Sequence, residues 1–406
     1  MRNKFPEIEN AIGEGNPVFL TKNGYGTMVV HSHNGYSKLI DDLEVIPGEA
    51  YCSRGEMSMK KTDLIIISCS ILFVFFMLNL VACGGRNSSD TQSGKAYRWK
   101  MGTIYNDPVS RPDFNGWGLS MQKFVDLVKE RTDGQIIIEP FYNSVLGANP
   151  ELFEQLRRGE LEVFYGQPMA TVDPRFGAFS IPYIFKNYDD VERLIANPDG
   201  PLFKLAQAWI RDNRGYLLSS GVSVFRGFFN TRQRVGAVTD IRNLKVRIYE
   251  DPVVNLFWKS ICNAGVIAYN EVYTALQTRT VDGLEFADTS VVSGRYYELG
   301  GHFSNIDWQW TWGANIVISQ RSWNELPENL KRIVSECGWK AMDVQKAVEL
   351  ENKAQAEETL KSLGVDFYHL TSQERQTWVD YARSLDDQMS AAIGFEAFNA
   401  IMDAVK

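Results

Sequence analysis

Histidine and cysteine, which most often bind zinc or carry nucleophilic catalysis, are scarce in this sequence of 406 residues. It has four His and five Cys, with no two Cys at CxxC spacing and no His at ligand spacing from a Cys. The sequence also lacks GxSxG, GxxxxGK[ST] and HExxH motifs, and no GxGxxG follows a strand pattern. These absences argue against a zinc enzyme, a serine hydrolase and a P-loop nucleotidase. We therefore expect no catalytic residues, no metal and no cofactor.

A basic surface is also missing. The net charge is −8, whereas a nucleic-acid-binding main body should carry a basic face. A small anionic ligand is not excluded, because one local arginine can outweigh a diffuse acidic surface.

The hydrophobic content of 44% and the charged content of 23% are globular values. The length suffices for two domains of ordinary size.

One long uncharged run, residues 64–82 (LIIISCSILFVFFMLNLVA), sets the expected compartment. Lys60-Lys61 precede it and Cys83 follows it, as in an export signal. The end of the run resembles the bacterial lipobox, which implies that Cys83 is lipidated and becomes the new N-terminus. A plain transmembrane helix is the alternative, since such a run nearly spans a bilayer. We interpret residues 57–83 as a lipoprotein signal peptide and residues 84–96, which are polar, as a tether.

The segment before this signal, residues 1–56, has a character of its own. Its run Asn16 to Gly24 (NPVFLTKNG), followed by Met28-Val29-Val30, resembles the Phd/YefM family of antitoxins over about residues 6–45. The resemblance implies binding to operator DNA. The alternative is a simple hairpin turn at Asn23-Gly24 between two apolar strands. We interpret the segment as a leader from a fused or mis-started reading frame.

From Tyr97 onward strands and helices alternate, which predicts an α/β fold with a largely parallel sheet. Strands are expected at 97–104, 135–141, 161–165, 222–230 and 244–248, and helices at 117–131, 150–158, 252–260 and 270–278. Capping-box patterns at Ser322…Glu325 and Thr371…Glu374 predict helix starts, and a long charged helix is expected over 340–363. Cys262 and Cys337 lie in apolar helical surroundings, which favours free thiols over a disulfide.

A run of motifs identifies a family. Asn243 to Pro252 (NLKVRIYEDP) is followed by Asn270 to Gln277 (NEVYTALQ) and then by Val281 to Glu285 (VDGLE). This region resembles the signature of DctP-type solute-binding proteins of tripartite ATP-independent periplasmic (TRAP) transporters. Further matches, such as Ile181 to Phe185 (IPYIF), extend the resemblance over about residues 98–406.

The resemblance implies a two-lobed periplasmic-binding-protein (clamshell) fold with a long helix crossing both lobes. The expected boundaries are 97–221 for lobe I and 222–310 for lobe II, with 311–406 forming a crossing strand and C-terminal helices that pack on both. The implied function is an extracytoplasmic, lipid-anchored binding protein that captures a small organic acid. Its implied partners are the membrane subunits of a TRAP transporter, and no nucleic acid is expected for the main body.

The resemblance also implies a ligand site. Arg247 matches the family arginine that holds the ligand carboxylate with two parallel N–H donors, a geometry that a guanidinium fork provides. Arg247 alternates with apolar Val246 and Ile248, so it points away from their shared face. Arg226 matches a second arginine near the pocket.

Four further residues complete the predicted site: Gln167, Glu250 and Asn106 as polar contacts, and Phe286 as an aromatic wall. Phe286 stands where many members have Asn, so we expect a ligand with one carboxylate and a less polar body. The alternatives from other classes are an exported carboxylate-dependent hydrolase and a DNA-binding antitoxin-like regulator acting through residues 6–45.

Overall fold

The structure is a computed structural model, and it describes residues 18–22, 25–30, 96–110 and 114–406. The chain divides into two compact units, residues 1–91 and residues 92–406. Cys83, the signal peptide and the tether predicted from the sequence lie outside the described residues, apart from Ala96. Among the described helices none is long and apolar enough to cross a membrane.

In the first unit the described residues form an antiparallel pair of strands, β1 (Val18–Lys22) and β2 (Tyr25–Val30). Val18 pairs with Val30 at one end of the pair and Lys22 with Tyr25 at the other. The two strands are thus those expected on either side of Asn23-Gly24. The likeness to Phd/YefM antitoxins stays a prediction.

The first sheet of the second unit has five strands in the order β4-β3-β5-β12-β6. Strands β3 (Tyr97–Gly102), β4 (Ile136–Phe141) and β5 (Val163–Tyr165) are parallel, as the alternation of strand and helix predicts. Strand β12 (Asn315–Ser319) pairs antiparallel with both β5 and β6 (Gly215–Ser220). A strand from the last third of the chain therefore completes a sheet that begins near residue 97.

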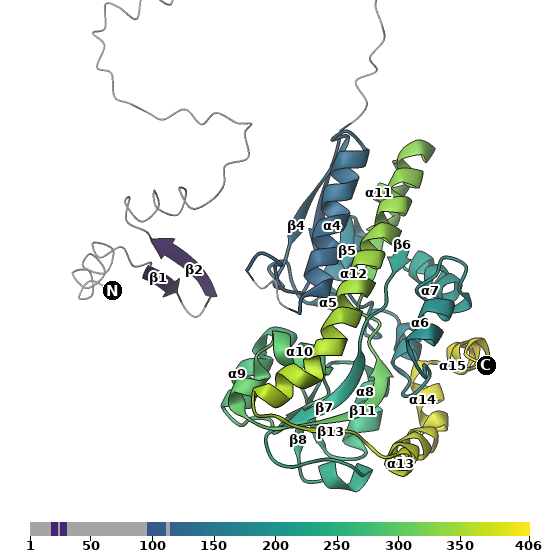
Figure 1. The fold of residues 1–406 in the computed structure, drawn as a ribbon. Helices are drawn as coiled ribbons and strands as arrows, with labels where there is room; N and C mark the ends of the chain where they lie inside the picture. Colours follow the sequence, from purple (N-terminus) through teal and green to yellow (C-terminus); the bar gives the residue numbers. More distant parts are fainter. Residues whose placement is uncertain (1–17, 23–24, 31–95, 111–113) are drawn as a thin grey trace, which may run out of the picture. The chain divides into compact units, whose positions relative to one another are not determined.

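The second sheet has six strands in the order β13-β11-β7-β10-β8-β9. They are β7 (Phe225–Asn230), β8 (Lys245–Ile248), β9 (Asn263–Val266), β10 (Gly283–Leu284), β11 (His302–Trp310) and β13 (Asp366–Tyr368). The chain passes between the two sheets from β6 to β7 and again from β11 to β12 (Figure 1).

A third connection is helix α12 (Glu328–Ser362), 35 residues long. It contacts helix α4 (Gly116–Arg131) and β6 of the first sheet, and helix α10 (Asp288–Ser293) and β13 of the second (Figure 1). This is the long crossing helix that the family resemblance implies. It begins at Glu328, twelve residues before the predicted start at Lys340, because the earlier turns already bury Leu330, Val334 and Cys337.

The remaining helices cover the sheets and the C-terminal end. They are α5 (Asn149–Arg158), α6 (Tyr188–Leu194), α7 (Pro201–Asp212), α8 (Pro252–Lys259), α9 (Val272–Gln277), α11 (Gln320–Asn324), α13 (Ser372–Arg383), α14 (Asp386–Ile393) and α15 (Phe395–Ala404). Thr371 and Glu374 form the predicted capping box of α13. The prediction for Ser322 is wrong: α11 has Ser319 as its N-cap, so Ser322 lies inside the helix and Glu325 ends it.

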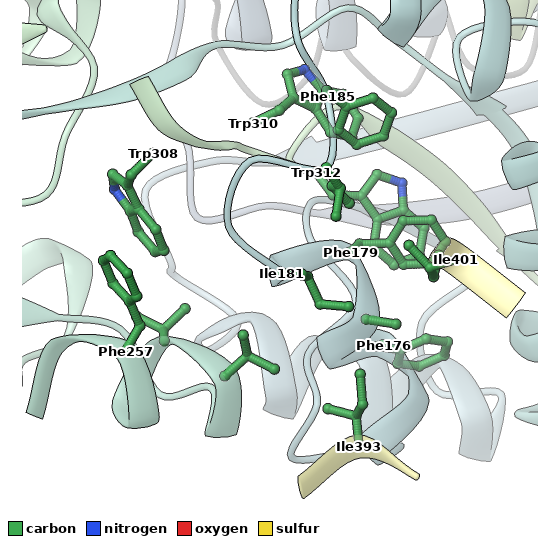
Figure 2. Packing of buried hydrophobic residues seen from close by; sticks show 14 of the residues in the cluster. Phe176, Phe179, Ile181, Phe185, Phe257, Trp308, Trp310, Trp312, Ile393 and Ile401 are labelled. Carbon is green, nitrogen blue, oxygen red and sulfur yellow. The ribbon is translucent and has the colours of Figure 1, made fainter. Parts of the chain in front are cut away.

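Aromatic side chains fill the core beside the second sheet (Figure 2). Trp308 and Trp310 are buried on β11, and Trp312 is buried just after it. Trp308 stacks on Phe257 of α8 at a centroid distance of 5.3 Å, and Trp312 stacks on Phe179 at 3.9 Å. These residues come from distant parts of the sequence, so this core ties α8 and the segment around Phe179 to the strand that leads from one sheet to the other. Cys262 and Cys337 are free thiols.

Candidate ligand site

A cavity with about 80 Å³ for the centres of water-sized groups lies where residues attached to the two sheets meet. Tyr105, Trp117 and Gln167 belong to the part of the chain that forms the first sheet, whereas Arg226, Arg247 and Phe286 belong to the second. Cavities with apolar walls and a few convergent polar groups are typical of small-molecule sites.

The order of strands in the second sheet brings the two arginines together. Short strand β10 lies between β7 and β8, antiparallel to β7 and parallel to β8. Arg226 is on β7, Arg247 is on β8, and Glu285 directly follows β10. Leu284 is in register with Arg247, so the next residue, Glu285, reaches both guanidinium groups.

Glu285 binds both arginines and is fully buried. Nε of Arg226 donates to a carboxylate oxygen of Glu285 at 2.5 Å and to its backbone carbonyl at 2.8 Å. Nη1 of Arg247 donates to the other carboxylate oxygen at 3.3 Å. Two positive charges share one negative charge, so the cluster keeps one unit of positive charge in a site shielded from water. Buried charges need partners, and the one uncompensated positive charge is chemically suited to an anion.

The pKa values of the two arginines differ in direction. Burial lowers the pKa of Arg247; Glu285 opposes this effect and Arg226 adds to it. For Arg226 burial also acts to lower the pKa, but Glu285 and Tyr249 outweigh it, and the pKa of Arg226 is raised. Glu285 therefore offsets the cost of burying the positive charge less completely for Arg247 than for Arg226.

Arg247 also has donors to spare. A guanidinium carries five N–H donors. Within the described part of the chain, one of them binds the carbonyl of Ile267 at 3.0 Å and one binds Glu285, which leaves three. Arg226 likewise uses Nε for Glu285 and Nη1 for the hydroxyl of Thr311 at 3.2 Å. Neither Nη2 group has a hydrogen-bond partner among the described residues.

Phe286 lies against both charges. Its ring is 5.0 Å from the guanidinium carbon of Arg247 and 5.4 Å from that of Arg226, and the ring of Tyr249 is 5.2 Å from Arg226. Cation–π contacts of this kind stabilise a desolvated guanidinium. Burial raises the pKa of Tyr249 to about 12, so its hydroxyl stays neutral. The aromatic wall thus shields the arginines from water and strengthens their field.

The structure brings together four of the six predicted ligand residues in this cavity: Arg247, Arg226, Phe286 and Gln167. Gln167 follows β5 and is buried. Asn106 lies instead in two neighbouring cavities. Glu250 is exposed and lines a wider opening that also contains Arg247.

Sequence reasoning missed the residues that complete the site. Glu285 is part of the signature motif, yet nothing in the sequence shows that it pairs with two arginines. Tyr105, Trp117 and Tyr269 were also missed, and all three line the cavity. The sequence signal that could have found them is an aromatic residue shortly after a strand, as at Tyr105, or in the first turn of a helix, as at Trp117. The described residues contain no group of three or more His, Cys, Asp or Glu suited to a metal ion.

Comparisons with known proteins identify the family of the chain. The pattern of the DctP family, described as "Bacterial extracellular solute-binding protein, family 7", matches residues 110–392. The C4-dicarboxylate-binding periplasmic protein DctP of Rhodobacter capsulatus is 25% identical, covering 71% of this chain and 86% of its own length.

Solved structures show the same fold. The sugar acid binding protein DctPAm from Advenella mimigardefordensis, in complex with galactonate, has a TM-score of 0.69 at 22% identity, covering 77% of this chain and 98% of that protein. A TRAP periplasmic solute-binding protein from Chromohalobacter salexigens with bound D-glucuronate has a TM-score of 0.69 at 25% identity, covering 76% and 99%. The chain therefore belongs to the DctP family of bacterial extracellular solute-binding proteins, the binding components of TRAP transporters.

Proposed function

We propose that this protein captures a small organic acid by placing its carboxylate on Arg247 and Arg226, and delivers it to the membrane subunits of a TRAP-type transporter. The observation that carries this proposal is the pair of buried guanidiniums that share the single carboxylate of Glu285. One net positive charge and unused donors remain beside an aromatic wall. Relatives of similar fold are described with galactonate, D-glucuronate or succinate, all of which carry a carboxylate.

The test is isothermal titration calorimetry of the full chain with a panel of monocarboxylates, keto acids, sugar acids and dicarboxylates. Arg247→Lys should weaken binding of the best acid by about 2 kcal/mol or more, roughly thirtyfold, because a point charge cannot replace the guanidinium fork. Arg158→Lys is the matched control, since Arg158 is exposed and does not line the cavity. Near-native affinity in Arg247→Lys would show that Arg247 is not the anchor.

A role in binding rather than catalysis is part of the proposal. Glu285, the buried carboxylate closest to the arginines, already accepts hydrogen bonds from both, so it is not free to act as a base. The relatives described above are likewise binding proteins. Turnover of any acid or glycoside by the purified chain would contradict this part of the proposal.

The compartment and the anchor are proposed from the sequence together with the family. The family is extracellular, and its pattern begins at residue 110, after the predicted signal peptide and tether. We propose that Cys83 carries the lipid and that lobe I (97–221) and lobe II (222–310) close over the ligand, with 311–406 packing on both. Mass spectrometry of the native protein should find an acylated peptide that begins at Cys83, and an intact Ala82–Cys83 bond would refute the anchor.

A further inference from the structure

A second, smaller chamber lies next to the ligand cavity. Tyr105, Trp117, Tyr269 and Ser290 line both of them, so the two share a wall. The chamber has room for about one water-sized group, with about 20 Å³ for its centre. Its far side includes Glu349 of the crossing helix α12.

Glu349 is an unusual residue to find there, because it is only 3% exposed. Its Oε1 has no hydrogen-bond partner among the described residues. The cation one turn further along α12, Lys353, is already paired with Asp288 at 2.5 Å. Burying a carboxyl oxygen without a partner is costly. A hydrogen bond with the Thr289 side chain acts to lower the pKa of Glu349, but Oε1 itself has no partner among the described residues, and a ligand group could supply one.

The position of Glu349 depends on close packing of α4 against α12. A Cβ atom on Gly116 would lie 3.3 Å from Oε2 of Glu349, so glycine lets the first turn of α4 approach the carboxyl. The next residue on α4 is Trp117, which lines the chamber. The same turn of helix thus holds Glu349 in place and contributes an indole ring to the wall.

Trp117 brings the complementary group. Its Nε1 is buried and has no hydrogen-bond partner in the part of the chain that the structure describes. An indole N–H is a donor only, and the ionised carboxylate of Glu349 accepts only. A group that satisfies both must accept one hydrogen bond and donate another. A hydroxyl does so, an ammonium group cannot accept, and an ionised carboxylate cannot donate.

We propose that Glu349 and Trp117 form a second subsite that receives one hydroxyl group of the bound acid, at the end remote from the carboxylate on Arg247. The inference rests on the proposed function, because the carboxylate anchor orients the ligand toward the chamber. It modifies the expectation drawn from Phe286: the acid has an apolar face against the aromatic wall but carries a distal hydroxyl. The ligand class is thus a hydroxylated monocarboxylic acid.

The experiment compares acids that differ by one hydroxyl group, measured by calorimetry on the full chain. The probes are straight-chain acids from butyrate to hexanoate, each with its counterpart hydroxylated on the last carbon, and D-gluconate with its terminal-deoxy analogue. For the pair of matching length, the wild type should prefer the hydroxylated acid by about tenfold or more.

The variants separate the two sites. Glu349→Met keeps the side-chain length but removes the acceptor, so the hydroxyl preference should fall to near unity while the deoxy acid still binds. Trp117→Phe should act in the same direction, and Glu349→Gln, which keeps an acceptor, should retain part of the preference. Glu396→Gln, an exposed change on α15, is the control and should leave the preference unchanged.

Each outcome has one meaning. Binding of the deoxy acid shows that a variant is folded. A wild-type protein without hydroxyl preference, or a preference that survives both Glu349→Met and Trp117→Phe, would overturn the subsite and leave the arginine anchor standing. If no acid of the series binds the wild type but another acid of the wider panel does, the subsite is overturned. If no acid of either panel binds, or if Arg247→Lys binds these acids normally, the proposed function fails instead.

Discussion

Glu285 is the residue whose removal changes the site most predictably. The change Glu285→Gln keeps the shape of the side chain but removes the charge shared by Arg226 and Arg247. All three side chains are almost completely buried, with side-chain exposures of 0% for Glu285, 10% for Arg226 and 4% for Arg247. Two guanidiniums would then face each other without a counter-charge, and the amide NH₂ of Gln would offer a donor where acceptors are needed.

The expected cost follows from the loss of a buried ion-pair partner. Such a loss destabilises a protein by about 3–5 kcal/mol, because an uncompensated charge remains buried. At about 2–4 °C per kcal/mol for a domain of this size range, the melting temperature should fall by roughly 10 °C. A ligand carboxylate should offset part of this loss, so a binding acid should raise the melting temperature of Glu285→Gln more than that of the wild type.

The assay is thermal and urea denaturation of the full chain with and without the acid. The double variant Arg226→Met/Glu285→Gln is the informative comparison, because it restores a single net positive charge and should recover part of the lost stability. Glu396→Gln again serves as the exposed control. If Glu285→Gln is as stable as the wild type, or if the acid stabilises it less than the wild type, the reasoning about a shared counter-charge is refuted.

Three further predictions concern stability. Burial raises the pKa of Glu349 from its usual 4.5 to about 7, so the folded state binds this proton more tightly than the unfolded state does. The free energy of unfolding should therefore fall by up to about 3 kcal/mol as the pH rises from 4.5 to 7. Urea titrations of Glu349→Gln should show a smaller fall, and the same dependence on pH as in the wild type would contradict the prediction. Phe257→Ala, which removes the ring stacked on Trp308, should cost about 3–5 kcal/mol of unfolding free energy, and a loss below that of an exposed-site control would refute the packing account. Thr371→Ala removes the cap of α13 and should cost about 1 kcal/mol, whereas Thr371→Ser should not.

Much of the second unit is readable from local patterns. The alternation of apolar residues gives strands β3, β4, β7 and β8 to within a few residues, and the position of Arg247 between Val246 and Ile248 predicts that its side chain leaves the apolar face. In the structure Val246 and Ile248 are fully buried in the core, and Arg247 lines the cavity. Two-residue periodicity suffices here because one face of the strand is apolar and the other carries the charge.

The charge cluster could not be read in the same way. Arg226, Arg247 and Glu285 lie far apart in the sequence, and they meet only because the two-residue strand β10 lies between β7 and β8. A strand that short has no periodic signal. The same holds for α12, whose first turns were not included in the predicted helix over 340–363. Strand order and helix contacts are long-range properties, and a local pattern does not contain them.

The measurement that tests the central claim most directly is a crystal structure of this protein with the tightest-binding acid found by calorimetry. The account predicts that the ligand carboxylate accepts hydrogen bonds from Nη2 of Arg247, with Arg226 and Phe286 in contact and Glu285 still bound to both arginines. A carboxylate bound elsewhere, with the Nη2 groups of both arginines unoccupied by the ligand, would contradict it.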